Sequence, residues 1–469
     1  MAEKLQKAKT RNVAAATFNW QQKGWPEFTC DHAALCDELR AFEAAFVRVK
    51  AALRKSQSPD AEVGALVDEA VTTSAIEGVR VNESVVMSSI CKALGVTCAP
   101  LGFARDARAE GVAQMMLKVR ADWKKRISAN LIQSWHAALM ANDSHGVPAG
   151  VFRSHADPMR VVRRDSYGEV EVRFEAPPSE RVPTEIAEFV ERWKSPAKGA
   201  EAVALKAALS HLHFESVHPF EDGNGRVGRA LVAKALAEGL GKPLVLPVSL
   251  VIDRRRKDYY EALHEASLSL DWTAWAKFFV PILTEALSDF LSAAAFVSAK
   301  RTFLSKHEAK LSKRAKKVFQ LMFRGGLTGV SSGLSASKWM RMTKVSKPTA
   351  TRDLAELVQA GVLLPEGVAG QMRYRLDFGC SESMDEPIND PINEPINDPI
   401  NDPIKQAVFG IVRASPGLNR GQVAARLGKS EATAKRALAA LVAAGKVEHR
   451  GSNKTGGYYL TNAAKSRIC

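Results

Sequence analysis

The chain has 469 residues, which is too long for one ordinary domain, and about three domains are expected from that length. Hydrophobic residues make up 46% of it and charged residues 25%, as is typical of a soluble globular protein. No apolar run approaches the length of a membrane span and no signal peptide begins the chain, so we expect a cytoplasmic protein with no membrane partner. The six cysteines show neither CxxC pairing nor zinc-ligand spacing, and we interpret them as reduced structural thiols.

The formal net charge of +15 is concentrated near the C-terminus. Residues 305–376 contain 14 Lys and Arg against 4 Asp and Glu, and residues 403–469 contain 12 against 2, so each segment has a net charge of +10. Residues 377–402, between them, have eight acids and no basic residue. Only about +3 remains for the first 304 residues, which suits an enzyme or a protein-interaction module.

Helical spacing of apolar residues dominates the front of the chain. One helix is expected to end near Gly78, because glycine is favoured just past a helix C-terminus. Alternating valines, among them Val161 and Val162, flank the turn-forming run Asp165–Gly168 and predict a β-hairpin over residues 159–174. Helices are expected over residues 31–55, 60–77, 103–142, 183–194, 200–217, 226–238, 256–268 and 273–300.

The run His218-Pro-Phe-Glu-Asp-Gly-Asn-Gly-Arg-Val-Gly-Arg229 joins two of these helices. Pro219 disfavours helical continuation at His218, so the first helix is expected to end there. A glycine-containing turn followed by a helix N-terminus presents backbone N–H groups to an anion. Arg226 and Arg229 are three residues apart and project from one side of the new helix, where they can hold phosphate oxygens.

Two further residues of this run complete a chemical set. A carboxylate at Asp222 would repel phosphate, and a bridging Mg²⁺ explains its presence. His218, at the entrance of the loop, can take a proton from an incoming hydroxyl group. The residues therefore predict phosphoryl or nucleotidyl transfer.

The same run resembles the signature of the Fic family, HPFx(D/E)GNGRxxR, at every fixed position. The resemblance implies transfer of AMP from ATP, the co-substrate, to a Tyr, Thr or Ser hydroxyl of a protein, with Mg²⁺ as cofactor. It implies that His218 is the general base, that Asp222 binds Mg²⁺, and that Arg226 and Arg229 hold the β- and γ-phosphates. The ATP site implied in this way consists of Asp222, Gly223, Asn224, Gly225, Arg226, Val227, Gly228, Arg229, Tyr259, Tyr260 and Ser267.

Other parts of the family pattern lie outside this run. Tyr259 and Tyr260 match a tyrosine pair that lines the adenine pocket, and Ser267 stands where many members have asparagine. The expected hairpin, with Val161 and Val162, matches the family's flap, which aligns the backbone of the target by strand addition.

The segment Thr73-Ser-Ala-Ile-Glu77-Gly78 resembles the family's inhibitory motif, (S/T)xxxE(G/N). The resemblance implies that Glu77 pairs with Arg229 and displaces the γ-phosphate of ATP, because a carboxylate and a triphosphate compete for one guanidinium. A solvent-facing glutamate at a helix end is the alternative. In some members the same glutamate supports removal of AMP, so the resemblance does not decide which direction of the reaction dominates.

Simpler interpretations exist for several of these residues. His211, Glu215 and His218 share one helix face, where a metal site is one alternative. A buried structural His218 is another, although it leaves the glycines and arginines unexplained. The charge run Asp253–Lys257 is either a solvated surface or a phosphate site.

Each basic C-terminal segment has the element order of a winged helix-turn-helix. In the first, Ser346 caps a helix that Pro348 helps to begin, and in the second a helix is expected over Ser430–Ala444 with a wing over residues 447–460. The net charge favours DNA as the partner, and a protein-interaction or dimerisation module is the alternative. The residues expected on the recognition helices are Lys347, Thr349, Thr351 and Arg352 in the first segment and Thr433, Lys435 and Arg436 in the second.

Residues 385–404 repeat a unit of Pro-Ile-Asn followed by an acid. Proline at every fourth position forbids both a helix and a central strand, and the acids repel one another. We expect an extended, semi-rigid spacer of roughly 60 Å. Docking of this segment to another protein is the alternative.

The helical spacing and the family resemblance together predict a mainly α protein with an all-helical Fic core, a β-hairpin flap and two small winged-helix domains. The expected segments are an N-terminal helical domain with the inhibitory helix (1–100), a Fic catalytic core (101–304), a winged helix-turn-helix (305–378), an acidic Pro-Ile-Asn repeat linker (379–402) and a second winged helix-turn-helix (403–469).

The leading functional hypothesis is an autoinhibited protein adenylyltransferase. Its expected partners are ATP, a protein substrate with a hydroxyl side chain, DNA at the winged helices and, from the family resemblance, a second copy in a homodimer. The alternative is a DNA-binding transcriptional regulator whose Fic core senses nucleotide or is inactive.

Overall fold

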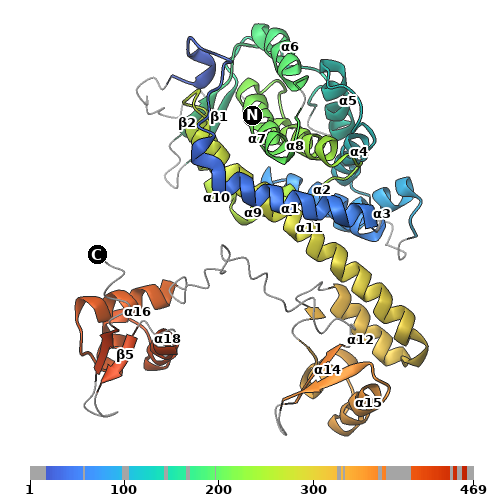
Figure 1. Cartoon of the computed structure of the whole chain (residues 1–469), viewed down its shortest axis with the longest axis vertical. Coiled ribbons are helices and arrows are strands. Elements are labelled where there is room, and N and C mark those ends of the chain that lie inside the picture. Colours follow the sequence, from blue (N-terminus) through green and yellow to red (C-terminus); the bar gives the residue numbers. More distant parts are fainter. Residues whose placement is uncertain are drawn as a thin grey trace. The chain divides into compact units, whose positions relative to one another are not determined.

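A computed structural model shows a mainly helical protein that also contains, among its described residues, three two-stranded antiparallel sheets (Figure 1). The chain divides into two compact units, residues 1–379 and residues 380–469. The described residues are 17–55, 59–97, 105–141, 146–164, 170–195, 197–324, 329–330, 333–367, 372–376, 403–443, 447–450 and 457–461.

The first unit begins with helices that match the expected positions in part. Sequence analysis placed no helix over residues 83–94, although the Asn82 side chain caps one there and Gly95 ends it in the left-handed conformation (φ 66°). The expected helical stretch over residues 103–142 is two helices, because Ser128 caps a new helix after an interruption. The helices are α1 (Cys36–Lys55), α2 (Pro59–Ile76), α3 (Glu83–Leu94), α4 (Ala107–Ala121) and α5 (Ala129–Met140).

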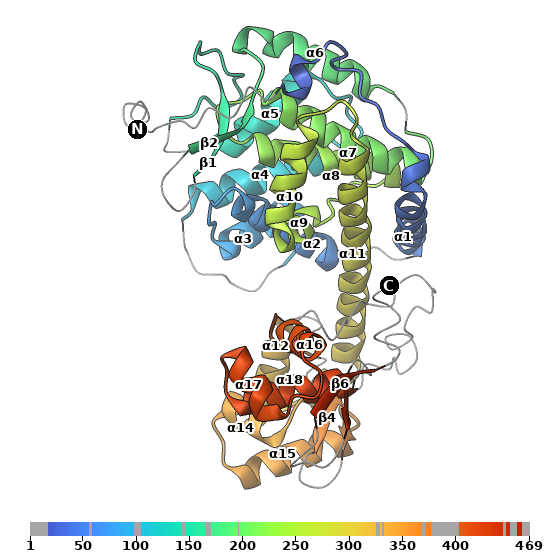
Figure 2. The same cartoon turned by 90° about the vertical axis from the view of Figure 1, so that its left-hand side faces the viewer.

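A β-hairpin follows, formed by β1 (Arg160–Arg164) and β2 (Val170–Glu175). The strands are antiparallel, with Val161 opposite Phe174 and an irregularity between Val161 and Val162. The expected turn, Asp165–Gly168, lies outside the described residues. Both views show the hairpin next to α10 (Arg256–Ala266), and the Nδ1 atom of His264 lies 2.6 Å from the Arg173 carbonyl oxygen (Figures 1 and 2).

The central helices of this unit surround the segment that carries the Fic-like signature. Helices α7 and α8 pack closely, since a Cβ atom at Gly239 would lie 2.5 Å from a methyl group of Val203. Helix α8 begins at Asn224, two residues before the expected start, so Asn224 and Gly225 belong to its first turn. The helices are α6 (Val182–Trp193), α7 (Ala200–Val217), α8 (Asn224–Leu240), α9 (Val248–Arg254), which was not expected, α10 and α11 (Thr273–His307).

Helix α11 is longer than expected and runs across residue 304. By length and composition alone, the helical segment Thr273–Lys310 could cross a membrane, although no apolar run of that length was expected from the sequence. Core helices pass the same test, and this helix places buried side chains in two apolar clusters. The buried side chains between Trp275 and Phe290 belong to the same apolar cluster as those of the preceding helices. Phe296 and Phe303 belong to the cluster formed by the elements that follow.

Those elements have the order of helices and strands expected of the first basic segment. They are α12 (Lys313–Arg324), α14 (Ala336–Thr343), α15 (Lys347–Gln359), β3 (Leu363–Glu366) and β4 (Arg373–Leu376). A separate apolar cluster around Trp339, Leu354 and Val318 holds them together.

The second unit has its own small core around Val412, Val423 and Leu438. Asn419 and Gln422 form a capping box at the start of α17. The expected repeat linker, residues 379–402, lies outside the described residues. The elements are α16 (Pro403–Ala414), which was not expected, α17 (Arg420–Leu427), α18 (Glu431–Ala443), β5 (Val447–Arg450) and β6 (Gly457–Leu460).

Of the three cysteines that the structure describes, one differs from expectation. Cys30 and Cys36 are free, but Cys91 is disulfide-bonded rather than a reduced thiol. Spacing along the chain does not show which thiols come within bonding distance after folding, and the expectation for Cys91 was wrong for that reason.

Candidate active site

The loop between α7 and α8 begins at His218, which has an unusual backbone conformation. Its φ of 49° and ψ of 59° place it in the left-handed region, and it is one of two described non-glycine residues with positive φ. That conformation costs a non-glycine residue about 1–2 kcal/mol. Such strain persists only where the surroundings hold it, and it is common at functional sites.

Buried contacts hold the rest of the loop. The side chain of Asn224 accepts a hydrogen bond from the Phe220 N–H at 2.9 Å and donates to the Phe220 carbonyl at 2.7 Å, so it closes the loop on itself. The imidazole of His136 stacks on the Phe220 ring at 3.8 Å. Because His136 Nδ1 accepts from the Gly150 N–H, its Nε2 carries the proton and donates to the Asp222 carbonyl at 3.0 Å.

The imidazole of His218 is kept neutral by its surroundings. Burial is the main cause that lowers its pKa to about 4, and the nearby guanidinium of Arg153 lowers it further. Its Nδ1 lies 3.7 Å from Oε2 of Glu215, on the side of α7. The other ring nitrogen, Nε2, is then available to accept a proton at neutral pH.

Asp222 sits where an anion would be bound at the start of α8. Its Oδ1 accepts from the Gly223 N–H at 2.6 Å and its Oδ2 accepts from Nη2 of Arg226 at 3.0 Å. The Asp222 side chain is more than half exposed, whereas Arg226 is buried. One backbone N–H and one guanidinium thus already bind a negatively charged group here.

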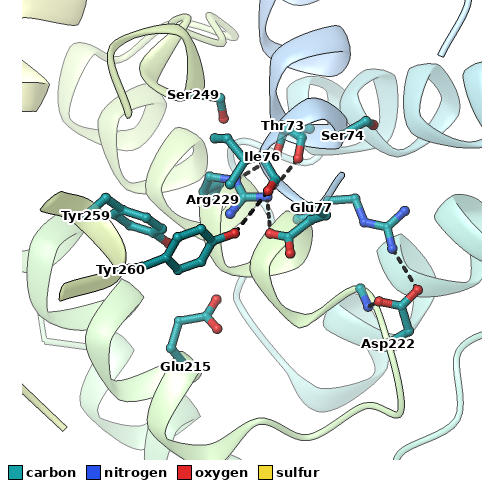
Figure 3. Close-up of polar contacts among 12 residues, drawn as sticks. Thr73, Ser74, Ile76, Glu77, Glu215, Asp222, Arg229, Ser249, Tyr259 and Tyr260 are labelled. Atoms are coloured by element: carbon teal, nitrogen blue, oxygen red, sulfur yellow. Dashed lines mark hydrogen bonds and ion pairs between the residues drawn. The ribbon is translucent and has the colours of Figure 1, made fainter. Parts of the chain in front are cut away.

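Arg229 is fully buried and is held by the end of α2 (Figure 3). Its Nε donates to Thr73 Oγ1 at 2.7 Å, and its Nη2 donates to the Thr73 carbonyl at 2.9 Å and to Glu77 Oε1 at 2.7 Å. Its Nη1 has no hydrogen-bond partner. Glu77 can reach this position because residue 225 is a glycine. A Cβ atom there would lie only 2.2 Å from Glu77 Oε1.

A cavity of about 670 Å³ lies in front of these residues. Its wall combines the hairpin, the α7–α8 loop, Glu77 and α10. Val227 is buried in the apolar core, and Gly228 packs against Glu215 and His211, so the structure does not bring these two to the cavity. Arg226 and Arg229 do not line it either. The expected site residues that line it are Glu77, Val161, Val162, His218, Asp222, Gly223, Asn224, Gly225, Tyr259, Tyr260 and Ser267.

The two tyrosines of α10 have different surroundings. Tyr259 is buried, and its hydroxyl lies 2.8 Å from Nε2 of His211. Tyr260 is 41% exposed, and its hydroxyl donates to the Ile76 carbonyl at 3.0 Å, next to Glu77 (Figure 3). The described residues contain no group of three or more His, Cys, Asp or Glu side chains arranged to hold a metal ion. The alternative of a metal site at His211, Glu215 and His218 is therefore not supported.

The charge run Asp253–Lys257 mostly forms ion pairs on the surface. Arg254 contacts Glu285 at 2.9 Å and Asp289 at 2.8 Å, and Arg255 also pairs with Glu285. Lys257 is the residue of this run that lines the cavity.

Comparison with known proteins is decisive for the central segment. Residues 126–236 match the sequence profile of the Fic/DOC family, and residues 18–96 match that of a "Domain of unknown function (DUF4172)". The first match contains the whole run from His218 to Arg229. The chain contains a Fic/DOC family domain.

Curated relatives of the Fic domain are named adenylyltransferases. A probable protein adenylyltransferase of Aquifex aeolicus (strain VF5) is 38% identical over 94 residues, which are 20% of this chain and 27% of that protein. Protein adenylyltransferase fic-1 of Caenorhabditis briggsae is 30% identical over 114 residues, and that of Caenorhabditis elegans is 40% identical over 63 residues. These matches cover 24% and 13% of this chain and 22% and 11% of the two relatives, so the similarity spans less than a third of each relative's length.

Solved structures give weaker matches. A Fic family protein from Desulfovibrio desulfuricans G20 aligns with 75% of this chain and 98% of its own, with a TM-score of 0.47 and 19% identity. Residues 134–508 of Fic-1 from C. elegans align with 56% of this chain and 75% of their own, with a TM-score of 0.41 and 17% identity.

Sequence analysis missed Asn19, which connects two walls of the Fic domain's cavity. Its side chain is fully buried and donates to Ser216 Oγ at 2.8 Å, two residues before His218. Its backbone N–H donates to the carbonyl of Ser267 at 2.6 Å, at the end of α10. The neighbouring Trp20 donates to the Glu175 carbonyl of the hairpin at 2.6 Å, so this short segment supports α7, α10 and β2 together.

Glu215 is a buried carboxyl group beside His218 that sequence analysis considered only as a metal ligand. Burial, reinforced by Glu77, raises its pKa to about 8. A carboxyl whose pKa is raised on folding binds its proton more tightly in the folded state. Its contribution to the stability of the folded protein is therefore full below pH 4.5 and is lost as the pH rises toward 8.

We therefore expect the contribution of Glu215 to the unfolding free energy to fall between pH 5.5 and pH 8.5. The substitution Glu215→Gln should remove part of this loss, on the order of 1 kcal/mol or more, because the amide does not ionise. Thermal melts at the two pH values check this. If the stability difference between the variant and the parent is the same at pH 5.5 and at pH 8.5, folding does not raise the pKa of Glu215.

Proposed function

We propose that the Fic domain of this chain transfers AMP from ATP to a hydroxyl side chain of a protein, and that Glu77 holds it in a restrained state. The observation that supports this most is the arrangement at the start of α8. A neutral His218 and the Asp222 carboxylate line the cavity there, and the buried Arg226 and Arg229 lie behind them on the first turns of α8. The relatives named protein adenylyltransferases point to the same reaction.

In this proposal His218 acts on the target hydroxyl. Its neutral imidazole accepts the hydroxyl proton while the hydroxyl oxygen forms a bond to the α-phosphorus of ATP. The bond from that phosphorus to the oxygen bridging to the β-phosphorus breaks, and pyrophosphate leaves. The product is a phosphodiester between AMP and the protein side chain.

The first turn of α8 would bind the triphosphate. The N–H groups of Gly223 to Gly225 and the guanidiniums of Arg226 and Arg229 are donors for its oxygens. The chemistry of Asp222 fits Mg²⁺, which commonly binds one or two carboxylates together with substrate phosphates. Held by Asp222, the ion would neutralise charge on the phosphates.

Glu77 competes for one of these phosphate donors. Its carboxylate pairs with Arg229 at 2.7 Å, and the same guanidinium has an unpartnered Nη1. A γ-phosphate that bound Arg229 would have to share or replace the Glu77 contact, and its charge would repel the carboxylate. The ion pair therefore restrains productive ATP binding. We also propose that the same glutamate assists removal of AMP from the modified target.

The hairpin is the proposed docking site for the target. Val161 and Val162 of β1 line the cavity and are 40% and 46% exposed. An extended target segment can add to an exposed strand edge by main-chain hydrogen bonds, which would bring its hydroxyl toward His218.

An assay with labelled ATP distinguishes this proposal from the alternative of a DNA-binding transcriptional regulator whose Fic core is inactive. Purified Glu77→Gly protein is incubated with Mg²⁺, ATP labelled at the α-phosphate, and a cell lysate. Labelled protein bands are expected, including the chain itself if it modifies its own hydroxyl groups. If neither the parent nor the variant labels any protein, the enzyme proposal fails and the regulator becomes the better account.

We also propose that the basic C-terminal segments bind duplex DNA. In the first segment a three-residue connection, residues 344–346, joins α14 to α15, and Lys347, Thr351 and Arg352 are exposed on α15. The helix pair and its short turn are typical of a helix-turn-helix, and the net charge of +10 suits a polyanionic partner. The corresponding positions of the second segment are Lys435 and Arg436.

Replacing Lys347 and Arg352 by alanine should weaken DNA binding and reduce its salt dependence. Each lost phosphate contact should reduce the slope of log affinity against log salt by about 0.9. Fluorescence anisotropy with a labelled duplex at several salt concentrations measures this, and Lys50→Ala on α1 is the control. An unchanged slope would show that α15 does not contact the DNA backbone.

A further inference from the structure

Arg153 binds three successive carbonyl groups at the point where α7 ends. Its Nε donates to the His218 carbonyl at 2.8 Å and its Nη2 to the Val217 carbonyl at 3.2 Å. Its own backbone N–H donates to the carbonyl of Pro219 at 2.9 Å. Arg153 is 3% exposed, so these contacts are made out of reach of solvent.

The same guanidinium also binds the segment that follows the hairpin. Its Nη2 donates to the Pro177 carbonyl at 2.6 Å, and its Nη1 donates to Ser179 Oγ at 2.9 Å. Arg153 thus connects the base of the hairpin to the entrance of the catalytic loop. It does not line the cavity, so it has no direct access to ATP or to the target hydroxyl.

These contacts explain how His218 keeps its left-handed backbone. Helix α7 would otherwise end with unpaired carbonyl groups at the negative end of its dipole, and a cation there is favourable. Carbonyls 217, 218 and 219 lie on either side of the strained φ and ψ angles. The planar guanidinium fixes the directions of the first two, and the Arg153 backbone N–H fixes that of the third.

We propose that Arg153 is a positioning residue for the transfer reaction: it holds the His218 backbone in the left-handed conformation and sets its place relative to the hairpin that receives the target. This inference rests on the proposed function of the Fic domain. It adds a residue outside the His218–Arg229 run, on a loop more than sixty residues earlier in the chain.

The pKa of the His218 imidazole provides a measurement that would not change if Arg153 had a purely structural role. The groups that act on its imidazole are the Glu215 backbone on its own helix and the charges of Glu77 at the end of α2, of Asp222 in the loop and of Arg153. The positive charge of Arg153 lowers the pKa of His218, so its removal should raise that pKa. A lysine at position 153 keeps the charge but loses the planar fork.

The experiment compares Arg153→Met and Arg153→Lys in the full-length Glu77→Gly chain, with Lys234→Met as the matched control. Lys234 is also fully buried and donates to three carbonyls, those of Asp122, Trp123 and Lys125, but at the end of α4. Three quantities are measured for each protein: kcat and KM for ATP in adenylyl transfer, the melting temperature, and the titration of the His218 imidazole by NMR. A His218→Ala spectrum identifies its signal.

Arg153→Met is expected to lower kcat by roughly 100-fold with KM for ATP nearly unchanged, because misplacement of a catalytic group by about 1 Å has an effect of this size. Its His218 signal should titrate at higher pH than in the parent. Arg153→Lys should also lose kcat but keep the parent titration, and Lys234→Met should lose stability without losing kcat. If Arg153→Met does not fold, Arg153→Lys and the control still decide the question.

A parent-like kcat in both Arg153 variants would overturn the inference, and so would a loss matched by Lys234→Met at equal loss of melting temperature. If the Glu77→Gly parent transfers no AMP, the proposed function fails. In that case the NMR titration still tests the contact, and an unshifted His218 signal in Arg153→Met would overturn it.

Discussion

The Glu77→Gly variant should transfer AMP about 10- to 100-fold faster than the parent chain. Glu77 holds Arg229 through a charged hydrogen bond of 2.7 Å, and bonds of this kind contribute about 1.5–3 kcal/mol. Without the carboxylate, Arg229 retains its two contacts with Thr73 and offers the remaining donors to phosphate. The measurement is the initial rate of label incorporation from ATP at saturating target or, for self-modification, at fixed enzyme concentration.

Glu77→Gln is the matched control for this prediction. The amide keeps the size of the side chain and can still accept a hydrogen bond from Arg229, but it lacks the charge that repels a phosphate. Its rate should therefore lie between those of the parent and Glu77→Gly. Equal rates for all three proteins would mean that the ion pair in the structure does not restrain the reaction.

The second large effect is expected from His218→Ala in the Glu77→Gly background. Loss of a general base typically costs about 100- to 10,000-fold in rate. ATP affinity should change little, because the phosphate donors belong to the first turn of α8. Transfer rate and nucleotide binding measured on the same preparation separate the two effects, and a variant that keeps its rate would exclude His218 as the base.

The pH dependence follows from the lowered pKa of His218. The base form is the neutral imidazole, and a pKa of about 4 keeps it neutral through pH 7. The kcat of Glu77→Gly should therefore stay on a plateau through the neutral range and fall only as the pH drops toward about 4. A fall centred near the ordinary histidine pKa of about 6.5 would show that burial does not perturb this group in the working enzyme.

The sequence was most informative where the chemistry lies within one short segment. The run from His218 to Arg229 contains a helix end, a turn and a helix start, and these follow from Pro219 and the glycines by local rules. The hairpin strands and the order of helices and strands in the first basic segment were predictable for the same reason, whereas α16 of the second was not expected. The start of α8 was misplaced by two residues, since Asn224 enters the helix while its side chain holds Phe220.

Contacts between distant segments were not predictable in this way. Arg153, Asn19 and His136 support the site through carbonyl groups and stacked rings that have no signature along the chain. Val227 and Gly228 were placed in the ATP site by their position in the run, but helical geometry turns them toward the core. The caps at Asn82 and Gly95 were local signals for α3 and could have been used.

Mass spectrometry of peptides from the Glu77→Gly reaction tests the central claim most directly. After incubation with Mg²⁺, ATP and lysate, the account predicts peptides that carry AMP in phosphodiester linkage to a Tyr, Thr or Ser side chain, and predicts none from the same reaction with His218→Ala. Peptides that carry only phosphate, or AMP-modified peptides at equal abundance in the His218→Ala reaction, would contradict it.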